Sequence, residues 1–373
     1  MRANNVLGII YSHSYDESIP ELTSVRTMAS VPFACRYRMI DFPLSSMVNS
    51  GITQVGVVTK THYQSLMDHI GTGKPWDLSR KREGLFILPP FNNASPYGIH
   101  DNRIQSFVSI LDFLRRSRHE YVVLSDANTI YNFDFNKLFK FHSKSEADIT
   151  IVYKNGKRPK LDNIMVLDMD DDTNRVNEIS LSPNGSEDVD YSLNIILLRK
   201  SLFEHLVQSA FCLNHDVFER DVLQRNVKSL RIFGYQAPGF SAVVDSLQGY
   251  YSTSMQLLSP KNRKTLFDPD NQIFTKVGDN VPATYSYDCN VKNSLIADGC
   301  IINGAVENSI LFRGVHIAEG AIVKNSILMQ GTIISRDSKL NCVITDKNAT
   351  VTPGKNLSGD ESFPIYLGKR ISV

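Results

Sequence analysis

The sequence predicts two parts in one chain: an α/β domain with a doubly wound, Rossmann-like sheet, followed by a left-handed parallel β-helix. Two observations support this fold class. In the first part, short apolar runs alternate with segments of helical periodicity, which is the pattern of a mostly parallel sheet with helices on both faces. In the last part, small and β-branched residues recur about every five or six positions, a period that an α-helix cannot hold.

Four apolar runs predict strands of the first domain, and two amphipathic segments predict helices between them. The strands are expected at 6–10, 52–59, 121–125 and 147–153, and the helices at 104–116 and 135–143. Sheets of this kind bind ligands beyond the carboxyl ends of their strands. We therefore expect a site in the segments that follow Ile10, Thr59 and Ser125.

The chain divides into a first domain, 1–258, a linker, 259–281, and a β-helix domain, 282–373. Residues 259–277 contain prolines and have no clear period, which is typical of a connection that wraps between domains. In the last domain, glycines separate the apolar positions, and Asn-Ser pairs recur at Asn293, Asn308 and Asn325. These hexapeptide repeats predict a coil in which each turn packs its apolar residues against the next.

The composition narrows the range of partners. The net charge is +1, so no broad basic surface is expected to bind nucleic acid or a membrane. No apolar run approaches the roughly 20 residues that span a bilayer, and the N-terminus lacks the pattern of a signal peptide. The five cysteines are scattered and form no CxxC pair, which indicates free thiols and a reducing, cytoplasmic location.

The segment after the first strand is unusual for a phosphate site. It reads HSYDESIPELT from His13 to Thr23 and contains no glycine. Glycines let backbone N–H groups approach phosphate oxygens, whereas carboxylates repel them. The loop instead carries Asp16 and Glu17. A turn that is placed for a nucleotide is therefore filled with bulky and acidic residues.

Several long motifs resemble those of the bacterial ADP-glucose pyrophosphorylases, also called glucose-1-phosphate adenylyltransferases. The motifs are VPFACRYRMIDFPLSSMVNSGI at 31–52, GTGKPWDLS at 71–79, LSDANTIYNFDF at 124–135 and GYYSTSMQLL at 249–258. The resemblance extends over nearly the whole chain. It implies a nucleotidyltransferase-like first domain, and a family reaction in which ATP and glucose 1-phosphate give ADP-glucose and pyrophosphate.

At several positions that carry the chemistry in that family, this chain has other residues. The arginine of the first loop falls on Ser18, the lysine before the VPF motif on Met28, the sugar-phosphate lysine on Ser182 and one metal-binding aspartate on Val243. Such groups neutralise charge during phosphoryl transfer, and losing one of them typically lowers the rate about 10²–10³-fold. The resemblance therefore implies a chain with no catalytic residues at these positions.

Two aspartates remain as candidate ligands of Mg²⁺. Asp126 corresponds to one metal-binding aspartate of the family, displaced by one position, and Asp245 lies two residues after Val243. Carboxylates of this kind hold Mg²⁺ between phosphates in the family reaction. We expect Mg²⁺ only if residual activity remains, and otherwise no cofactor.

The pattern resembles the non-catalytic, D-type subunit that accompanies the catalytic subunit in low-GC Gram-positive bacteria. This implies a regulatory role in glycogen synthesis and a hetero-tetramer with the catalytic subunit, and we expect some homodimer in isolation. Three alternatives stay open. They are a weakly active enzyme that uses Asp126 and Asp245, a sugar-phosphate sensor without chemistry, and an acyltransferase whose base is His316 in the repeats.

Four residues are candidates for binding a sugar-phosphate or nucleotide effector. Arg36 and Arg38 lie in the VPF motif and Lys74 in the GTGKPW motif. Each supplies a cation that either binds an anion or pairs with a nearby acid. Trp76, the single tryptophan, either stacks on a base or packs the loop. Both roles stay open from the sequence.

Overall fold

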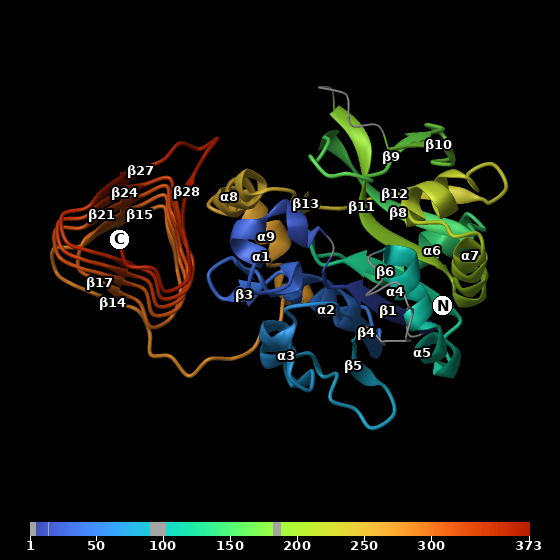
Figure 1. The fold of residues 1–373 in the computed structure, drawn as a ribbon, viewed down its shortest axis with the longest axis horizontal. Helices are drawn as coiled ribbons and strands as arrows, with labels where there is room; N and C mark the ends of the chain where they lie inside the picture. Colours follow the sequence, from blue (N-terminus) through green and yellow to red (C-terminus); the bar gives the residue numbers. More distant parts are fainter. Residues whose placement is uncertain (1–4, 14, 90–101, 182–187) are drawn as a thin grey trace.

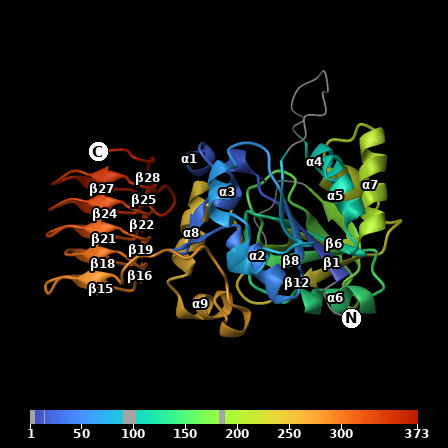
Figure 2. The ribbon, with the colours of Figure 1, turned by 90° about the horizontal axis from the view of Figure 1, so that it is seen from below.

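The structure, a computed structural model, describes residues 5–13, 15–89, 102–181 and 188–373. An α/β domain and a β-helix lie side by side, and the stacked coils of the β-helix run along one flank of the domain (Figure 1, Figure 2). Both predicted parts are present in the predicted order.

A nine-stranded sheet forms the centre of the α/β domain. Its parallel half has the order β5-β4-β1-β6. These strands are β1 (Val6–Tyr11), β4 (Gln54–Val58), β5 (Gly84–Leu88) and β6 (Tyr121–Asp126). Because the chain builds outward from β1 first through β4 and β5 and then through β6, the strand order reverses beside β1. A ligand cleft is expected at that reversal.

The other half of the sheet is largely antiparallel, so the prediction of a mostly parallel sheet is wrong for this half. β11 pairs antiparallel with both β6 and β8, while β12 adds to β8 in parallel. The strands of this half are β8 (Ile149–Lys157), β9 (Val166–Met169), β10 (Val176–Ser180), β11 (Asp188–Arg199) and β12 (Ile232–Gln236). For β9 and β10 the reason is local: residues 170–175 connect the two strands without a helix, and such short connections favour antiparallel neighbours.

Helices cover both faces of the sheet, and each face has its own apolar core. Successive residues of β1 alternate between the two cores, as a strand buried on both sides requires. One face carries α2 (Asp41–Asn49), α3 (Gln64–Ile70) and α6 (Phe135–Lys144), and the other carries α4 (Arg103–Ser109), α5 (Leu111–Arg116) and α7 (Lys200–Cys212). The helix predicted at 104–116 is therefore two helices that meet at Ile110.

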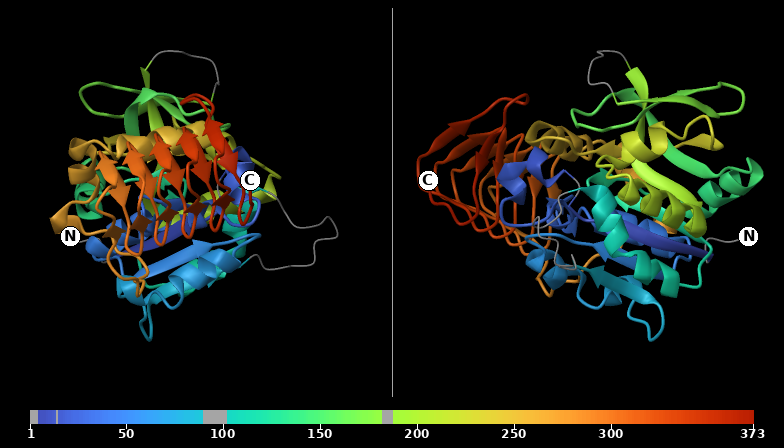
Figure 3. Two further views of the ribbon diagram at one scale, coloured as in Figure 1. Left: turned by 90° about the vertical axis from the view of Figure 1, so that its left-hand side faces the viewer. Right: turned by 45° about the vertical axis from the view of Figure 1, so that its right-hand side comes forward.

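The C-terminal domain is a left-handed parallel β-helix with three flat faces (Figure 3). The first face contains β14 (Thr284–Tyr285), β17 (Ile301–Ile302), β20 (His316–Ile317), β23 (Ile333–Ile334) and β26 (Thr350–Val351). The second contains β15 (Asn290–Lys292), β18 (Ala305–Glu307), β21 (Ile322–Lys324), β24 (Lys339–Asn341) and β27 (Asn356–Ser358). The third contains β16 (Leu295–Ile296), β19 (Ile310–Leu311), β22 (Ile327–Leu328), β25 (Val343–Thr345) and β28 (Ile365–Leu367).

The Asn-Ser pairs of the repeats mark one corner of this coil. Asn293, Asn308 and Asn325 have φ angles of 41°, 47° and 46°, in the left-handed region that asparagine tolerates better than other non-glycine residues. Their side chains also stack: Asn293 Nδ2 donates to Asn308 Oδ1 at 2.7 Å. The repeated asparagine therefore has two effects, a backbone turn in each coil and a ladder of amides between coils.

The linker predicted at 259–281 is irregular only in part. Residues Pro260–Leu266 form α9, which begins with proline in its first turn, a position that proline favours. Beyond a short turn, Pro269–Asn271, the chain crosses as an extended connection to the start of the β-helix (Figure 1).

The two domains share a buried interface. Helix α8 (Leu247–Gln256) lies against the third face of the β-helix (Figure 2), and Tyr251 donates a hydrogen bond to the carbonyl of Asn325 at 2.7 Å. Arg26 and Asp346 form a buried ion pair at 2.5 Å across the same interface. Among the described residues, no helix is long and apolar enough to cross a membrane.

Candidate functional site

A cleft of about 960 Å³ opens at the carboxyl ends of β1 and β4, two of the three places where the sequence predicts a site. Its walls come from the loop after β1, the segment 60–62 after β4, the start of α4, and the segment 216–219. These elements are far apart in the chain and meet at the reversal of strand order.

The loop after β1 is held in place by its own contacts. Tyr15 adopts a φ of 61°, a conformation that glycine reaches without strain, and its hydroxyl accepts a hydrogen bond from Asn194 Nδ2 at 3.3 Å. The Asp16 carboxylate accepts a hydrogen bond from the backbone N–H of Met28 at 2.7 Å. The loop thus points side chains, rather than free backbone N–H groups of a glycine turn, into the cleft.

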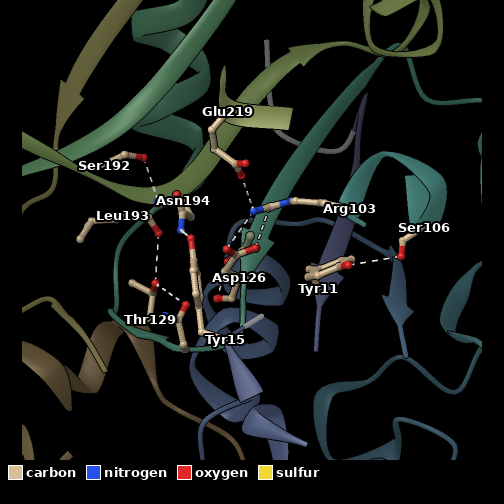
Figure 4. A network of polar contacts seen from close by, with 12 residues as sticks. Tyr11, Tyr15, Arg103, Ser106, Asp126, Thr129, Ser192, Leu193, Asn194 and Glu219 are labelled. Carbon is tan, nitrogen blue, oxygen red and sulfur yellow. Dashed lines mark hydrogen bonds and ion pairs between the residues drawn. The ribbon is translucent and has the colours of Figure 1, made fainter. Parts of the chain in front are cut away.

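One arginine and two carboxylates form the buried centre of the cleft (Figure 4). Arg103, at the start of α4, donates from Nη2 to Asp126 Oδ1 at 2.7 Å and from Nη1 to Asp126 Oδ2 at 3.1 Å. Nη1 also donates to Glu219 Oε1 at 2.8 Å. Asp126 ends β6, and Glu219 lies in the π-helical segment η5 (Phe218–Gln224). This Arg103 triad therefore joins three separate elements.

The charge of Arg103 is fixed by its two partners. Burial by itself lowers the pKa of Arg103, but the charges of Asp126 and Glu219 raise it, and the net shift is upward. The guanidinium also lies over the ring of Tyr11, 5.1 Å from its centroid. Arg103 is therefore a permanent cation at the centre of the cleft.

The carboxylates predicted to hold Mg²⁺ are engaged in other contacts. Both Asp126 oxygens accept hydrogen bonds from Arg103. Asp245 accepts from the backbone N–H of Lys160 at 2.7 Å and from the hydroxyl of Ser246 at 2.8 Å. In the part of the chain that the structure describes, no group of three or more His, Cys, Asp or Glu residues is arranged to hold a metal ion. With Arg103 in place, this donor set does not fit Mg²⁺, and the shared site of Asp126 and Asp245 stays a prediction.

The replaced family positions lie in different surroundings. Ser18 lines the cleft, whereas Met28 is fully buried beneath the loop. Val243 is buried in β13 (Ala242–Val243), which pairs with β7 (Thr129–Ile130) just after β6. Ser182 lies outside the described residues. The structure therefore places Ser18 in the same cleft as the Arg103 triad but leaves Met28 and Val243 as packing residues.

A second, smaller cavity of about 230 Å³ lies between the two domains. The hairpin of β2 (Pro32–Phe33) and β3 (Tyr37–Arg38) contributes Arg36 and Arg38 to its wall. Three more cations complete the lining, Lys276, Arg313 and Lys347. The structure thus brings the two candidate arginines together with basic residues from the connection and the β-helix.

The charges around this cavity are only partly balanced. Burial, together with the nearby Arg38 and Arg26, lowers the pKa of Lys347 to about 7. Burial also lowers the pKa of Arg38 to about 10, although Asp41 opposes the shift. Arg38 itself donates from Nη1 to the backbone carbonyl of Ser65 at 2.5 Å. Clustered cations with depressed pKa values are stabilised by a bound anion.

The other two ligand candidates do not line either cavity. Lys74 is exposed on its loop. Trp76 is almost completely buried, and its ring packs edge-on to His69 with centroids 5.9 Å apart. The structure favours packing of the loop over stacking on a base, because the indole has no accessible face.

His316 lies on the outer surface of the β-helix. His316, in β20, pairs in register with Ile301 of the coil before it and with Ile333 of the coil after it. Both isoleucines are exposed, so the row points away from the core. A catalytic histidine needs a group that orients its ring, and the two neighbours in this row are apolar.

Five residues that line the two cavities were not singled out from the sequence: Arg103, Glu219, Lys276, Arg313 and Lys347. Arg103 directly precedes the helix predicted at 104–116, and its partners lie 23 and 116 residues away. Local periodicity carries no signal for contacts of that separation. The one usable signal in the sequence is the place of Arg103, an arginine at the start of a predicted helix that adjoins the expected ligand site.

Comparison with known proteins defines the class of the fold and cleft. The nucleotidyl transferase family model matches residues 19–231, and a model described as the GlmU-like C-terminal hexapeptide matches residues 281–362. The chain belongs to the nucleotidyl transferase family, in agreement with the resemblance drawn from its motifs.

Its relatives narrow the class further. The glycogen biosynthesis protein GlgD of Bacillus subtilis is 35% identical over 370 residues, which cover 98% of this chain and 96% of the relative. GlgD of Geobacillus stearothermophilus is 39% identical over 321 residues, 86% of this chain and 83% of the relative. The glucose-1-phosphate adenylyltransferase of Clostridium perfringens (strain SM101) is 27% identical over 379 residues, 100% and 97% of the two chains. These similarities support a role in glycogen biosynthesis.

Proposed function

We propose that this chain is a non-catalytic, regulatory subunit of ADP-glucose pyrophosphorylase. In this role it supports the synthesis of ADP-glucose from ATP and glucose 1-phosphate by a catalytic subunit, within a hetero-tetramer. The observation that carries the proposal is the Arg103 triad, because it engages the one family metal-binding aspartate that the sequence retains. The similarity to GlgD along the whole chain favours the same role.

The charge of the cleft supports the absence of turnover. Its described lining contains five acidic side chains but two cationic ones, Lys60 and Arg103. The acidic side chains are Asp16, whose pKa is raised to about 7, and Glu17, Asp162, Asp216 and Glu219. A triphosphate would meet net repulsion in this lining. Each missing charge-stabilising group raises a phosphoryl-transfer barrier by roughly 2.7–4 kcal/mol. The cleft therefore opposes the charge that the family reaction develops.

The test is pyrophosphate release from ATP, glucose 1-phosphate and Mg²⁺. It is run with this chain alone, with the catalytic subunit alone, and with both. We expect no release from this chain alone and a higher rate in the mixture than with the catalytic subunit alone. Release by this chain that is abolished in Asp126→Asn would support the weakly active enzyme instead. An unchanged rate in the mixture would reject the regulatory role.

A second candidate function is the binding of a sugar-phosphate effector without chemistry. The cationic cavity between the domains is the specific observation in its favour. A ligand at 100 times its Kd adds about 2.7 kcal/mol to the free energy of unfolding. Because the cavity is bounded by both domains, binding there would also be placed to couple them.

Thermal unfolding with glucose 1-phosphate, and separately with inorganic phosphate, tests this candidate. The Tm is expected to rise in the intact chain and to rise much less in Arg36→Ala. Lys74→Ala is the matched control, since Lys74 is exposed and lines neither cavity. Trp76 provides a second readout, because His69, which lines the cavity, contacts its ring. No shift with either probe would reject the effector site.

A further inference from the structure

We infer that Arg103 stands in for a divalent cation between Asp126 and Glu219, and that removing its side chain creates a divalent-cation site at these carboxylates. Two oxygens from different carboxylates converge on one nitrogen: Nη1 is 3.1 Å from Asp126 Oδ2 and 2.8 Å from Glu219 Oε1. Convergence of carboxylate oxygens on one point is what a hard cation requires.

Burial makes a cation at this point necessary. The side chains of Asp126 and Glu219 are 0% and 6% exposed. Two carboxylates this close and this buried repel each other, and a cation that lies between them offsets that repulsion. Arg103 supplies that charge from within the chain. Without it, the two carboxylates would face each other with no guanidinium between them.

In the inferred site, Glu219 is the second carboxylate, whereas a site shared by Asp126 and Asp245 stays a separate prediction. Asp245 is held by Lys160 and Ser246, whereas Glu219 shares the Arg103 nitrogen with Asp126. Glu219 and Arg103 also line the open cleft, so water can complete the coordination of an ion bound there. The intact chain is thereby closed to divalent cations at its centre.

The inference does not depend on the regulatory role, because it concerns metal binding by this chain without a partner. Mn²⁺ is the probe, followed by the loss of the free-ion electron paramagnetic resonance signal on addition of protein. The variants are Arg103→Ala, Arg103→Lys, which keeps the charge, and Arg103→Ala/Glu219→Gln. Arg80→Ala is the matched control, because Arg80 forms an exposed ion pair with Asp77.

We expect Arg103→Ala to bind one Mn²⁺ at least about 10-fold more tightly than the intact chain, and the added Glu219→Gln to remove that gain. Arg103→Lys and Arg80→Ala should bind Mn²⁺ no better than the intact chain. If Arg103→Ala is unfolded, recovery of its cooperative unfolding on addition of Mn²⁺ supports the inference, and failure to recover overturns it. Equal Mn²⁺ binding by Arg103→Ala and the intact chain, or a gain that survives Glu219→Gln, also overturns it.

Discussion

Tyr15 and Asp16 define the entrance of the cleft at the scale of single residues. Tyr15 takes a left-handed backbone conformation, and its side chain reaches Asn194. Asp16 turns its carboxylate inward to the N–H of Met28. These contacts stabilise the loop in a shape that presents side chains, and not the backbone N–H groups of a glycine turn, to the cleft.

Asp16 should make the stability of the chain depend on pH. Burial raises the pKa of Asp16 to about 7, from an ordinary value of 3.8, although the Met28 N–H and Lys60 oppose the shift. The folded chain therefore holds this proton more tightly than the unfolded chain, and the free energy of unfolding falls as pH rises from about 4 to about 7. The decrease is of the order of 1–4 kcal/mol.

Urea unfolding at pH 5 and pH 8 measures this effect. Asp16→Asn keeps an oxygen acceptor for the Met28 N–H but cannot ionise. The free energy of unfolding of this variant should therefore change less between pH 5 and pH 8 than that of the intact chain. Glu21→Gln is the control, since Glu21 is exposed and is not among the groups that shift the pKa of Asp16. Equal pH dependence in Asp16→Asn and the intact chain would contradict the prediction.

At the scale of elements, the coils of the β-helix repeat regularly because the backbone turns in a similar way at each corner. Each turn passes through a residue with positive φ, and the Asn-Ser pairs place asparagine there. The amide ladder then ties one coil to the next. The repeat in the sequence is thus a repeat of backbone conformation as well as of apolar packing.

Asn308 separates these two contributions. Asn308→Ala loses the amide contact and forces alanine into a φ of 47°, which should lower the free energy of unfolding by about 1–2 kcal/mol. Asn308→Gly loses the same contact but accepts the φ, so it should cost less, about 0.5–1 kcal/mol. Chemical denaturation measures both. Asn290→Ala, an exposed position of β15, is the control, and an alanine variant as stable as the glycine variant would disprove the role of φ.

At the scale of the whole molecule, the two domains are joined by a common core. Buried residues of the α/β domain, α8 and the β-helix belong to one apolar cluster. The ion pair of Arg26 and Asp346 lies within this interface, and Tyr366 donates to Asp346 at 3.2 Å. We therefore expect both domains to unfold in a single transition.

Breaking this ion pair should be costly. Arg26→Met leaves the Asp346 carboxylate buried without its cation, which should lower the free energy of unfolding by about 3–5 kcal/mol. The double variant Arg26→Met/Asp346→Asn removes the charge as well and should recover part of the loss. A double-mutant cycle by chemical denaturation measures the coupling. Additive losses in the cycle would show that the pair does not couple the domains, and Arg80→Ala serves as the exposed control.

The sequence by itself determined the two-part architecture, the β-helix, the missing glycines of the first loop and the replaced family positions. These features are local: periodicity, turn chemistry and residue identity depend on neighbours in the chain. It missed the antiparallel half of the sheet and the break at Ile110, where short connections and packing decide.

The tertiary structure alone decided which charges meet. Arg103 reaches Asp126 and Glu219 across 23 and 116 residues, and the cationic cavity joins Arg36 and Arg38 to residues more than 200 positions later. Such contacts arise because the reversal of strand order and the docking of the β-helix bring distant segments to one place. Burial then determines what the meeting charges do, since a cation that is buried between carboxylates interacts with them far more strongly than one in water.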